Sequence, residues 1–520
     1  MNMNTSQQHQ ILWADDEIDL LKPHLMFLRS RGYDVTTATG GHDVLELIEQ
    51  HPFDLIILDE NMPGLTGLET LSRIKQRLPH TPVVMITKSE EENIMNQAIG
   101  NKIADYLIKP VNPNQILLSL KKLLHSDRLV SEQATRDYRE DFSQLAQLIN
   151  SADTIDDWYD LYGKLVYREM ELAHSSTNME DMLEQQKAEA NFEFAKWIRR
   201  NYENWMPGHK GDSPLMSPRL FPDRVFPMLD RGEKVFFILI DNFRLDQWRT
   251  IQPILAEYFV FEEELYTTIL PTATQYARNS IFSGLMPEQI SKMFPELWVD
   301  EDSEEGKNLN ESPLIATMLE RYRKKYKFSY NKINDSAAGE KLLRDFKQLL
   351  TNDLNVIVLN FIDMLSHART ESKMIRELAS TNAAYRSLTE SWFRHSSAID
   401  LFRAIAASGA KIVLTTDHGT IRVTNPIKVV GDRNTTTNIR YKVGKNLSYN
   451  SKQVYEIKKP RDFGLPSPNV SSAYIFALGR DFFAYPNNFN YYVTYFTDTF
   501  QHGGISMEEM LVPLVTMSAK

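Results

Sequence analysis

Short apolar runs alternate with amphipathic stretches of helical periodicity over the first quarter of the chain. Strands that alternate with helical stretches of about ten to fifteen residues are typical of parallel sheets with crossover helices. The pattern therefore predicts an α/β domain with a (βα)5 fold over residues 8–126. The expected strands are Ile11–Ala14, Asp34–Ala38, Leu55–Leu58, Pro82–Ile86 and Asp105–Ile108.

A different pattern follows over residues 127–206. This segment is rich in Glu, Gln, Leu and Ala, repeats apolar positions at helical spacing and contains no proline. We expect several helices here, which form a linker or a dimerisation segment.

Proline and glycine then become frequent, in "MPGHKGDSPLMSPRLFP", and mark a boundary. A second alternation of apolar and amphipathic stretches occupies residues 207–520. Its strongest apolar runs are Val235–Ile240, Val356–Phe361 and Lys411–Thr415. We expect one α/β domain with a central, mostly parallel sheet.

Composition narrows the class of protein. A chain of 520 residues is too long for one core, and its length suggests about three domains. No apolar run is long enough to span a bilayer and no charged-then-apolar leader opens the chain, so we expect a cytoplasmic protein without membrane insertion. There is no cysteine, so any metal must be bound by Asp, Glu, His or hydroxyl groups. The net charge of −11 argues against a protein that coats nucleic acid.

Polar side chains follow four of the five strands predicted in the first domain. Asp15 and Asp16 follow the first strand, Asp59 the third, Thr87 the fourth and Lys109 the fifth. Ligands of parallel sheets bind at the carboxyl ends of the strands, so these side chains should meet at one edge. Three carboxylates would repel one another unless a cation joined them, and oxygen ligands suit Mg²⁺. Any one of them could be an ordinary surface carboxylate, but the joint spacing favours a site.

This set, together with "LDENMPG", "MITKS" and "ADYLIKP", resembles the receiver domain of two-component response regulators. The resemblance implies that Asp59 accepts a phosphoryl group from a sensor histidine kinase. It also implies that Mg²⁺ is bound by Asp15, Asp16, Asp59 and the main chain of Asn61, that Thr87 and Lys109 hold the phosphoryl oxygens, and that Tyr106 occupies a switch position.

The output of this receiver does not look like a DNA-reading domain. The rest of the chain contains neither a helix-turn-helix signature nor a basic recognition helix. We therefore expect a different kind of output.

A second group of carboxylates lies in the carboxy-terminal domain. Asp241, Asp363 and Asp417 each terminate an apolar run, and parallel strands would bring them to one crevice. Three histidines accompany them. Three Asp and three His suit two borderline divalent cations, most simply Zn²⁺, which can hold the attacking and leaving oxygens of a phosphoryl transfer. The histidines are His367, one helical turn after Asp363, His418, next to Asp417, and His502, in "FQHGGISMEEM".

A hydroxyl nucleophile is available in "LPTATQYARNSIFSGLMP", which follows a strand and opens a helix. The start of a helix favours an anion, and a hydroxyl held between two cations loses its proton readily. Thr272 and Thr274 both satisfy this pattern.

The motifs from Asp241 to His502 resemble the alkaline phosphatase superfamily in its PglZ-type branch. That resemblance implies a dizinc phosphoesterase in which Gly284, ten residues downstream, selects Thr274 as the nucleophile. It places Arg278 near the reacting group. It assigns one Zn²⁺ to Asp241, Thr274, Asp417 and His418. It assigns the other Zn²⁺ to Asp363, His367 and His502, and this second ion shares the Thr274 oxygen with the first. A degenerate site that only binds ligands is the alternative.

Residues 422–461 hold ten Lys or Arg against two acidic residues, Asp432 and Glu456. Tyr441, Tyr449 and Tyr455 are interleaved with them. Basic groups attract phosphates and aromatic faces stack bases, so we hypothesise a phosphodiesterase that acts on linear or cyclic oligonucleotides. A solvated lid without a binding role is the alternative.

The chain as a whole resembles the response regulators of the type IX secretion system that carry a PglZ-type output domain. The resemblance implies control by phosphorylation and a complex with an extracytoplasmic-function sigma factor. We expect phosphorylation of Asp59 to remodel the receiver face near Tyr106 and to pair two chains in a homodimer. The alternative is a non-catalytic platform that binds a sigma factor or a nucleotide and uses zinc structurally.

Overall fold

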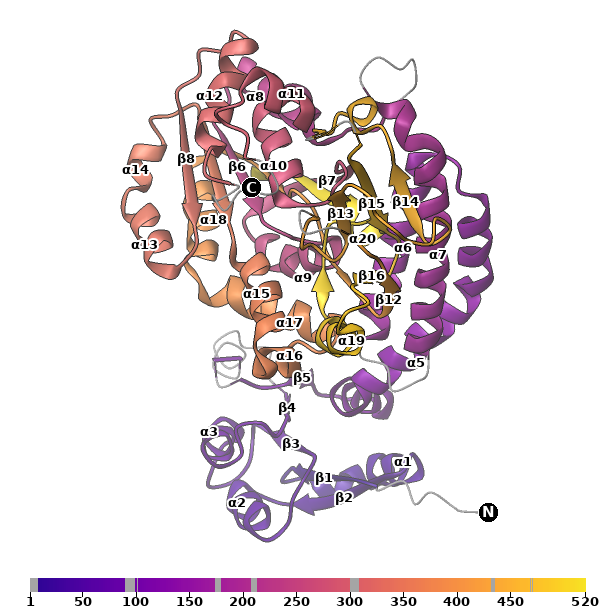
Figure 1. Ribbon diagram of the computed structural model, residues 1–520. Coiled ribbons are helices and arrows are strands. Elements are labelled where there is room, and N and C mark those ends of the chain that lie inside the picture. The colour runs from indigo at the N-terminus through magenta and orange to yellow at the C-terminus, as the bar shows by residue number, and fades with distance from the viewer. Residues whose placement is uncertain are drawn as a thin grey trace. The chain divides into compact units, whose positions relative to one another are not determined.

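The computed structural model describes residues 8–88, 99–100, 102–173, 179–206, 213–299, 308–431, 435–467, 469 and 471–520 (Figure 1). The chain divides into two compact units, Met1–Gln133 and Ala134–Lys520. Among the described residues no helix has the length and apolar character needed to cross a membrane.

The first unit is built on a five-stranded parallel sheet of order β2-β1-β3-β4-β5. Alternate residues of each strand enter cores on opposite faces: Leu12 packs with α2 and α3, and Trp13 packs with α1. The (βα)5 receiver fold is confirmed. The elements are β1 (His9–Ala14), η1 (Ile18–Leu21), α1 (Lys22–Ser30), β2 (Tyr33–Ala38), α2 (Gly41–Gln50), β3 (Leu55–Asp59), α3 (Gly67–Arg77), β4 (Val83–Thr87) and β5 (Asp105–Ile108).

The middle of the chain is helical, as predicted. It consists of α5 (Pro113–Ser151), α6 (Ile155–Leu172), α7 (Met179–Asn201) and the short 3-10 helix η2 (Tyr202–Trp205). A capping box between Thr154 and Asp157 starts α6. Helix α5 contributes residues to both compact units, so the predicted boundary at 126/127 falls inside a continuous helix.

The second unit contains a six-stranded sheet of order β7-β18-β10-β6-β9-β8. Strands β10, β6, β9 and β8 are parallel, and β18 runs antiparallel between β7 and β10. All six side chains of β6 are buried, as expected for a strand covered on both faces. The mostly parallel central sheet is confirmed. Its strands are β6 (Val235–Ile240), β7 (Phe259–Thr267), β8 (Phe328–Ile333), β9 (Leu354–Leu359), β10 (Lys411–Thr415) and β18 (Leu511–Ala519).

Helices and three small sheets surround this sheet (Figure 1). The helical elements are η3 (Ser217–Arg219), η4 (Phe221–Val225), α8 (Phe226–Asp230), α9 (Leu245–Leu255), α10 (Thr274–Ser283), α11 (Pro287–Met293), α12 (Glu311–Arg321), α13 (Ser336–Arg344), α14 (Phe346–Leu349), α15 (Phe361–Glu371), α16 (Lys373–Leu378), α17 (Asn382–His395), α18 (Ser397–Ser408), η5 (Pro460–Phe463), α19 (Phe489–Phe496) and α20 (Met507–Met510). The small sheets pair β11 (Ile421–Arg422) with β17 (Phe500–Gln501), β12 (Asn425–Lys428) with β16 (Asp481–Ala484), and β15 (Ala473–Ala477) with β13 (Tyr441–Gly444) and β14 (Val454–Ile457).

One predicted strand is displaced. The apolar run Val356–Phe361 was expected to be a strand that ends next to Asp363, but β9 covers Leu354–Leu359 and Phe361 already begins α15. Short apolar runs fit a buried strand and the start of a buried helix equally well. Asp363 therefore lies in the first turn of a helix rather than at the end of a strand.

Candidate functional site

The receiver sheet brings three carboxylates and one ammonium together at the ends of its strands. One oxygen each of Asp15, Asp16 and Asp59 lie within 4.8 Å of one another. Nζ of Lys109 lies 2.7 Å from Asp15 Oδ2 and 3.0 Å from Asp59 Oδ2. Asp15 and Asp59 are buried, whereas Asp16 is exposed. Among the described residues, Oδ1 of Asp59 is buried without a hydrogen-bond partner, so this oxygen-rich group fits Mg²⁺.

Burial dominates the electrostatics of this cluster. Burial raises the pKa of the Asp59 carboxyl above its ordinary value, although Lys109 works against the rise. Burial alone would lower the pKa of Lys109, but its hydrogen bonds to Asp15 and Asp59 outweigh that effect and leave it raised. The ammonium is therefore charged at neutral pH.

The remaining predicted receiver residues lie on neighbouring elements. Thr87 is buried at the end of β4, and Tyr106 lies on the adjacent strand β5. Burial raises the pKa of Tyr106, and a hydrogen bond with Thr87 opposes that rise. Asn61 is exposed in the loop that follows β3.

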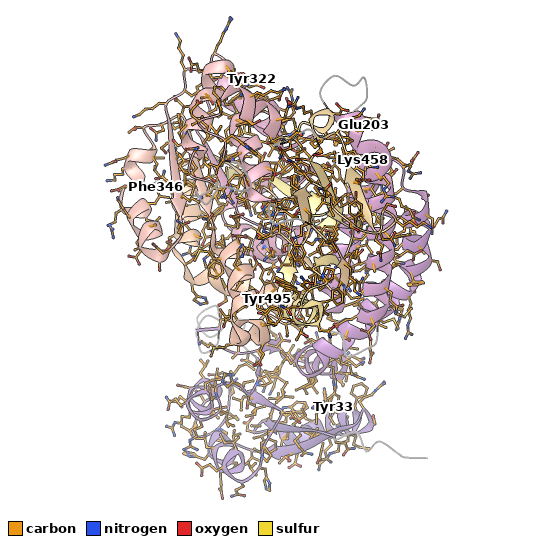
Figure 2. All side chains as sticks on the ribbon, in the orientation of Figure 1. Tyr33, Glu203, Tyr322, Phe346, Lys458 and Tyr495 are labelled. Carbon is orange, nitrogen blue, oxygen red and sulfur yellow. The ribbon has the colours of Figure 1, made fainter. Side chains whose placement is uncertain are left out.

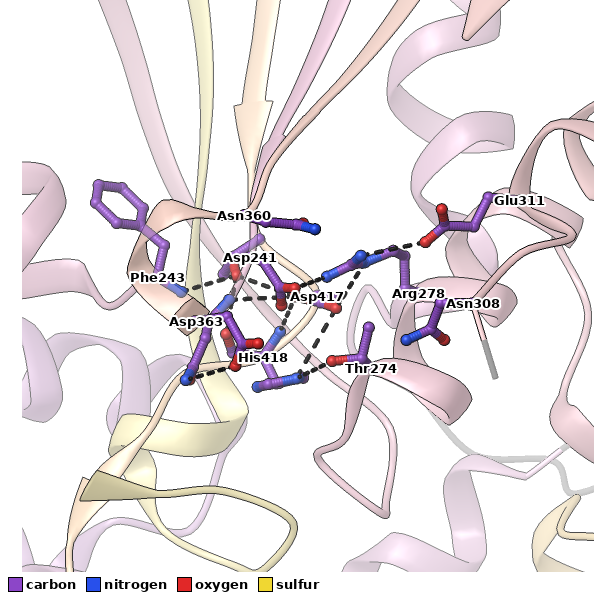
Figure 3. Close-up of polar contacts among 12 residues, drawn as sticks. Asp241, Phe243, Thr274, Arg278, Asn308, Glu311, Asn360, Asp363, Asp417 and His418 are labelled. Atoms are coloured by element: carbon purple, nitrogen blue, oxygen red, sulfur yellow. Dashed lines mark hydrogen bonds and ion pairs between the residues drawn. The ribbon is translucent and has the colours of Figure 1, made fainter. Parts of the chain in front are cut away.

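The central sheet of the second unit brings the other three aspartates together. Asp241 directly follows β6, Asp417 follows its neighbour β10, and Asp363 lies in the first turn of the helix after β9. Since these strands are adjacent and parallel, their carboxyl ends share one edge. Figure 3 shows the three carboxylates pointing toward one another.

Two groups of ligating atoms form at this edge. One contains Asp241, Asp417 and His418, all buried. The other contains Asp363, His367 and His502, of which His367 is exposed. Within each group, one ligating atom of every residue lies within 4.8 Å of the others. Carboxylate and imidazole ligands suit zinc, so the residues fit the expected cations.

Backbone carbonyls orient two of the imidazoles. Nδ1 of His418 lies 3.1 Å from the carbonyl oxygen of Gly419, and Nδ1 of His502 lies 3.1 Å from that of Thr272. A nitrogen that donates to a carbonyl leaves the other ring nitrogen free to bind a metal. In both residues Nε2 is therefore the ring nitrogen that is available to a cation.

Burial keeps these imidazoles neutral. It lowers the pKa of His418 and of His502 to about 3. Burial also raises the pKa of Asp241 to about 7; the charge of Asp417 adds to the rise, and Arg278 opposes it. The pKa of Asp363 is raised by burial and by the charge of Asp241. Neutral imidazole is the form that binds metals, whereas the crowded carboxylates would gain from a cation.

The two candidate nucleophiles have different surroundings. Oγ1 of Thr272 donates to the carbonyl oxygen of Gly504 at 2.9 Å and accepts from the N–H of Gly503 at 3.0 Å. Oγ1 of Thr274, the first residue of α10, lies 3.1 Å from Nε2 of His418. The Thr272 hydroxyl thus forms its hydrogen bonds with the backbone, whereas the Thr274 hydroxyl lies beside His418, a candidate metal ligand.

Arg278 lies on the next turn of α10 and is fully buried. Its guanidinium forms ion pairs with Asp241, Asp417 and Glu311. The sequence placed Arg278 near the reacting group; in the structure it binds two carboxylates of the first group (Figure 3).

Sequence reasoning missed Asn242. It is buried, with φ of 62°, a left-handed conformation that asparagine adopts more readily than most residues. Its side-chain amide donates to Asp363 Oδ1 at 3.3 Å, and its backbone N–H donates to Asp417 Oδ1 at 3.4 Å. Asn242 therefore links the two ligand groups, and only its place after Asp241 could have indicated this role.

The tyrosines of the basic segment do not form a stacking surface. Tyr441 and Tyr455 are buried, at 4% and 5% exposure. Tyr449 donates to Glu456 and packs against the small hydrophobic core around Val454. The predicted base-stacking role is wrong for Tyr441 and Tyr455, because both rings are buried in the large hydrophobic core of the second unit.

The positive charges of this segment are only partly accessible. Arg440 is buried and paired with Glu509, and Lys442 is buried with its ammonium donating to the carbonyl of Thr436. Asp432 lies outside the described residues. Among the described residues of this segment, five basic side chains are exposed: Lys428, Lys452, Lys458 (labelled in Figure 2), Lys459 and Arg461.

The chain matches three family models. Residues 220–517 match the BREX system PglZ alkaline phosphatase-like domain. The chain belongs to this family. Ahead of the PglZ domain, residues 11–121 match the response regulator receiver domain and residues 128–206 match the PorX response regulator linker domain. This is the architecture of a PorX-like response regulator with a PglZ output domain, as the sequence motifs predicted.

Individual proteins resemble the chain over its receiver domain. The transcriptional regulatory protein ZraR of Klebsiella oxytoca is 33% identical over 25% of this chain and 30% of its own length. The regulator PhoP of Bacillus subtilis, named for alkaline phosphatase synthesis, is 29% identical over 30% of this chain and 64% of its own length. The chain thus spans less than two thirds of these relatives. The chemotaxis response regulator CheY4 of Vibrio cholerae is 29% identical in a structural match of TM-score 0.22 that covers 23% of this chain and all of CheY4.

Proposed function

We propose that the PglZ domain is a dizinc phosphodiesterase with Thr274 as its nucleophile. The observation that carries the proposal is the 3.1 Å contact between the Thr274 hydroxyl and Nε2 of His418, a member of the first group of candidate metal ligands. Asp241, Asp417 and His418 would hold one Zn²⁺, and Asp363, His367 and His502 the other.

Bound zinc would polarise the phosphoryl oxygens and lower the pKa of the hydroxyl. The chain's own residues supply the geometry. Thr274 opens α10, where the N–H groups of the first turn favour a phosphate oxygen. With its proton lost, the Thr274 oxygen would attack phosphorus and expel one alcohol, which takes up a proton from water. Water would then cleave the bond between phosphorus and the Thr274 oxygen, which releases a phosphomonoester and restores the hydroxyl. Arg278 would hold Asp241 and Asp417 in place.

Hydrolysis of bis(4-nitrophenyl) phosphate, a simple diester, tests the proposal. Thr274→Val should lower kcat by about three orders of magnitude while the protein keeps its zinc, because only the nucleophile is lost. Thr274→Ser is the matched control and should keep measurable turnover. Full activity of Thr274→Val, or a parent protein that holds no zinc, would refute the proposal.

The proposed substrates are linear or cyclic oligonucleotides. With Tyr441 and Tyr455 buried, the remaining support is charge: five basic side chains are exposed among the described residues between 428 and 461, in a chain with net charge −11. Phosphate contacts of this kind weaken as salt rises. Turnover of a dinucleotide, a cyclic dinucleotide and a phosphomonoester should be compared at two salt concentrations. Cleavage of the monoester alone would exclude the oligonucleotide class.

The proposed regulation begins at Asp59. A sensor histidine kinase would phosphorylate Asp59 with Mg²⁺ bound, and the phosphorylated chain would pair into a homodimer and bind an extracytoplasmic-function sigma factor, in control of type IX secretion. Beryllofluoride, a phosphoryl mimic, should double the molar mass measured by light scattering. An unchanged mass over the accessible concentrations would refute the pairing.

The second candidate function is a non-catalytic platform that binds a sigma factor or nucleotide with structural zinc. The ion pairs of Arg278 with both carboxylates of the first group favour it, because the arginine already neutralises them. Partner binding that survives in Thr274→Val, together with no hydrolysis by the parent, would support the platform.

A further inference from the structure

The helices of residues 134–206 are connected by polar contacts to the two loops that carry Asp241, Asp417 and His418, and also to the loop that carries Thr274. We infer that α6, α7 and η2 form a positioning scaffold for the cation site, with Tyr202 and Asn191 as its anchors. This inference rests on the proposed function, since it concerns the same site. The helices lie alongside the strands of the PglZ domain in Figure 1, and their polar contacts with it are buried.

Tyr202 anchors the nucleophile loop. It is fully buried in η2, and its hydroxyl oxygen accepts the backbone N–H of Leu270 at 2.8 Å. Four residues later the same loop presents Thr274, and the carbonyl of Thr272 between them orients His502. A single hydroxyl of the helical segment thus fixes a loop on which one nucleophile and one ligand depend.

Asn191 anchors the loop of His418. It is buried in α7; its Oδ1 accepts the N–H of Met507 at 2.8 Å, and its Nδ2 donates to Glu508 Oε2 at 2.9 Å. These residues belong to α20, which lies directly against Gly419: the N–H of Gly419 donates to the carbonyl of Glu509 at 3.1 Å. The carbonyl of Gly419 in turn orients His418.

A chain of buried ion pairs reaches the third loop. Lys187 on α7 pairs with Glu169 on α6 at 2.5 Å, and Glu169 pairs with Arg386 at 2.8 Å. Arg386 pairs with Asp246 at 3.2 Å, which forms a two-pronged contact with Arg244. Arg244 lies three residues after Asp241. The ion pairs therefore connect α6 and α7 to the loop that carries Asp241.

The contacts of Tyr202, Asn191 and the ion pairs hold the backbone that positions the candidate metal ligands, without binding the metal themselves. Partners of ligating residues fix ring and loop orientation, and their loss typically lowers metal affinity about 10- to 100-fold. The hydrogen bonds of Tyr202 and Asn191 are buried, so water cannot readily replace a lost partner, and a broken contact leaves an unpaired polar group. We therefore expect their loss to displace the loops that they hold.

The test uses the full chain and three readouts. Tyr202→Phe and Asn191→Leu should weaken zinc binding about 10- to 100-fold in a competitive chelator titration, and should alter the visible spectrum of the cobalt(II)-substituted protein. In metal-free protein, Tyr202→Phe should speed amide hydrogen exchange of residues 268–274 measured by mass spectrometry. None of these readouts needs a substrate.

Tyr138→Phe is the matched control. It removes an equally buried hydroxyl, which donates to Gln186 at 3.1 Å inside the helical segment, and should leave zinc affinity and the cobalt spectrum unchanged. The inference is overturned if both test variants bind zinc as tightly as the parent and Tyr202→Phe exchanges amide hydrogens at the parental rate. It is also overturned if Tyr138→Phe loses as much zinc affinity as the test variants do. If the parent binds no zinc, the proposed function is refuted. The scaffold is tested separately by hydrogen exchange, and unchanged exchange in Tyr202→Phe would overturn it.

Discussion

Nε of Arg278 lies 3.0 Å from Oδ2 of Asp417, and the same guanidinium also contacts Asp241 and Glu311. All four side chains are buried. One arginine therefore contacts three carboxylates in the interior of the PglZ domain, and two of these, Asp241 and Asp417, are candidate zinc ligands.

Replacement of Arg278 by methionine should destabilise the metal-free protein by about 3–5 kcal/mol, because buried carboxylates lose their partner. Zinc should restore part of that loss, since a divalent cation can take over the neutralisation. Urea-induced unfolding with and without a chelator measures both effects. Arg231→Met, which removes an exposed pair with Glu233, is the control and should change stability by less than about 1 kcal/mol. Equal losses in the two variants would contradict this account.

Gly419 is required by close packing. A Cβ atom there would lie 2.0 Å from the backbone carbonyl oxygen of Glu508. Gly419→Ala should therefore lower the free energy of unfolding by about 1–3 kcal/mol and weaken zinc binding through His418. Gly163→Ala is the control: it lies within α6, its nearest new contact is 3.5 Å away, and alanine there should stabilise the helix by about 0.5–1 kcal/mol. A Gly419→Ala variant as stable as the parent in thermal unfolding would rule out the clash.

His502 should make the metal-free protein sensitive to acid. Its pKa is about 3 in the folded state against an ordinary value of 6.5, so the unfolded state binds more protons below pH 6.5. Stability from this group is present above pH 6.5 and falls by about 1.4 kcal/mol per pH unit as the pH drops toward 3. His418 acts in the same direction, whereas Asp241, with its raised pKa, acts in the opposite one.

Denaturant unfolding of the metal-free parent and of His502→Asn at pH 7, 6 and 5 isolates the contribution of His502 to the pH dependence of the free energy of unfolding. The asparagine variant should lose stability less steeply, and the difference between the two proteins should change by about 2 kcal/mol from pH 7 to pH 5. Parallel stability curves would show that His502 titrates normally.

In the receiver, Lys109 and Mg²⁺ should compete for the same oxygens. Lys109→Met removes the ammonium that contacts Asp15 and Asp59, so Mg²⁺ should bind about 5-fold more tightly, the equivalent of about 1 kcal/mol. Titration calorimetry measures the affinity. Lys88→Met, which removes only an exposed pair with Glu17, should leave it unchanged. Weaker Mg²⁺ binding in Lys109→Met would mean that the lysine organises the site rather than competing for it.

Much of the fold follows from apolar periodicity, and the candidate ligands follow from strand ends. Asp241 and Asp417 follow buried strands of one parallel sheet, so their meeting could be predicted without coordinates. Asp363 was found for a partly wrong reason: the apolar run before it was assigned to one strand, although its end is the first turn of α15.

The errors and omissions share a physical cause. Tyr441 stands between Arg440 and Lys442 in the sequence, yet all three side chains are buried, so a stretch of basic and aromatic residues does not by itself show that its rings are exposed. Tyr202 and Asn191 lie far along the chain from the loops they hold, and helical spacing shows which face is buried but not what covers it. Contacts of this range depend on packing, which local pattern does not encode.

The place of β18 in the central sheet governs when the PglZ domain can form. This strand lies between β7 and β10, with a register that runs to Ala519 opposite Phe259. Until the ribosome has made residues 511–519, β7 and β10 each expose a row of unpaired backbone groups and cannot join. Translation must therefore proceed some hundred residues beyond β10 before the sheet closes. A nascent or prematurely truncated chain that ends ahead of Leu511 would carry every candidate zinc ligand and still lack the strand that joins its sheet.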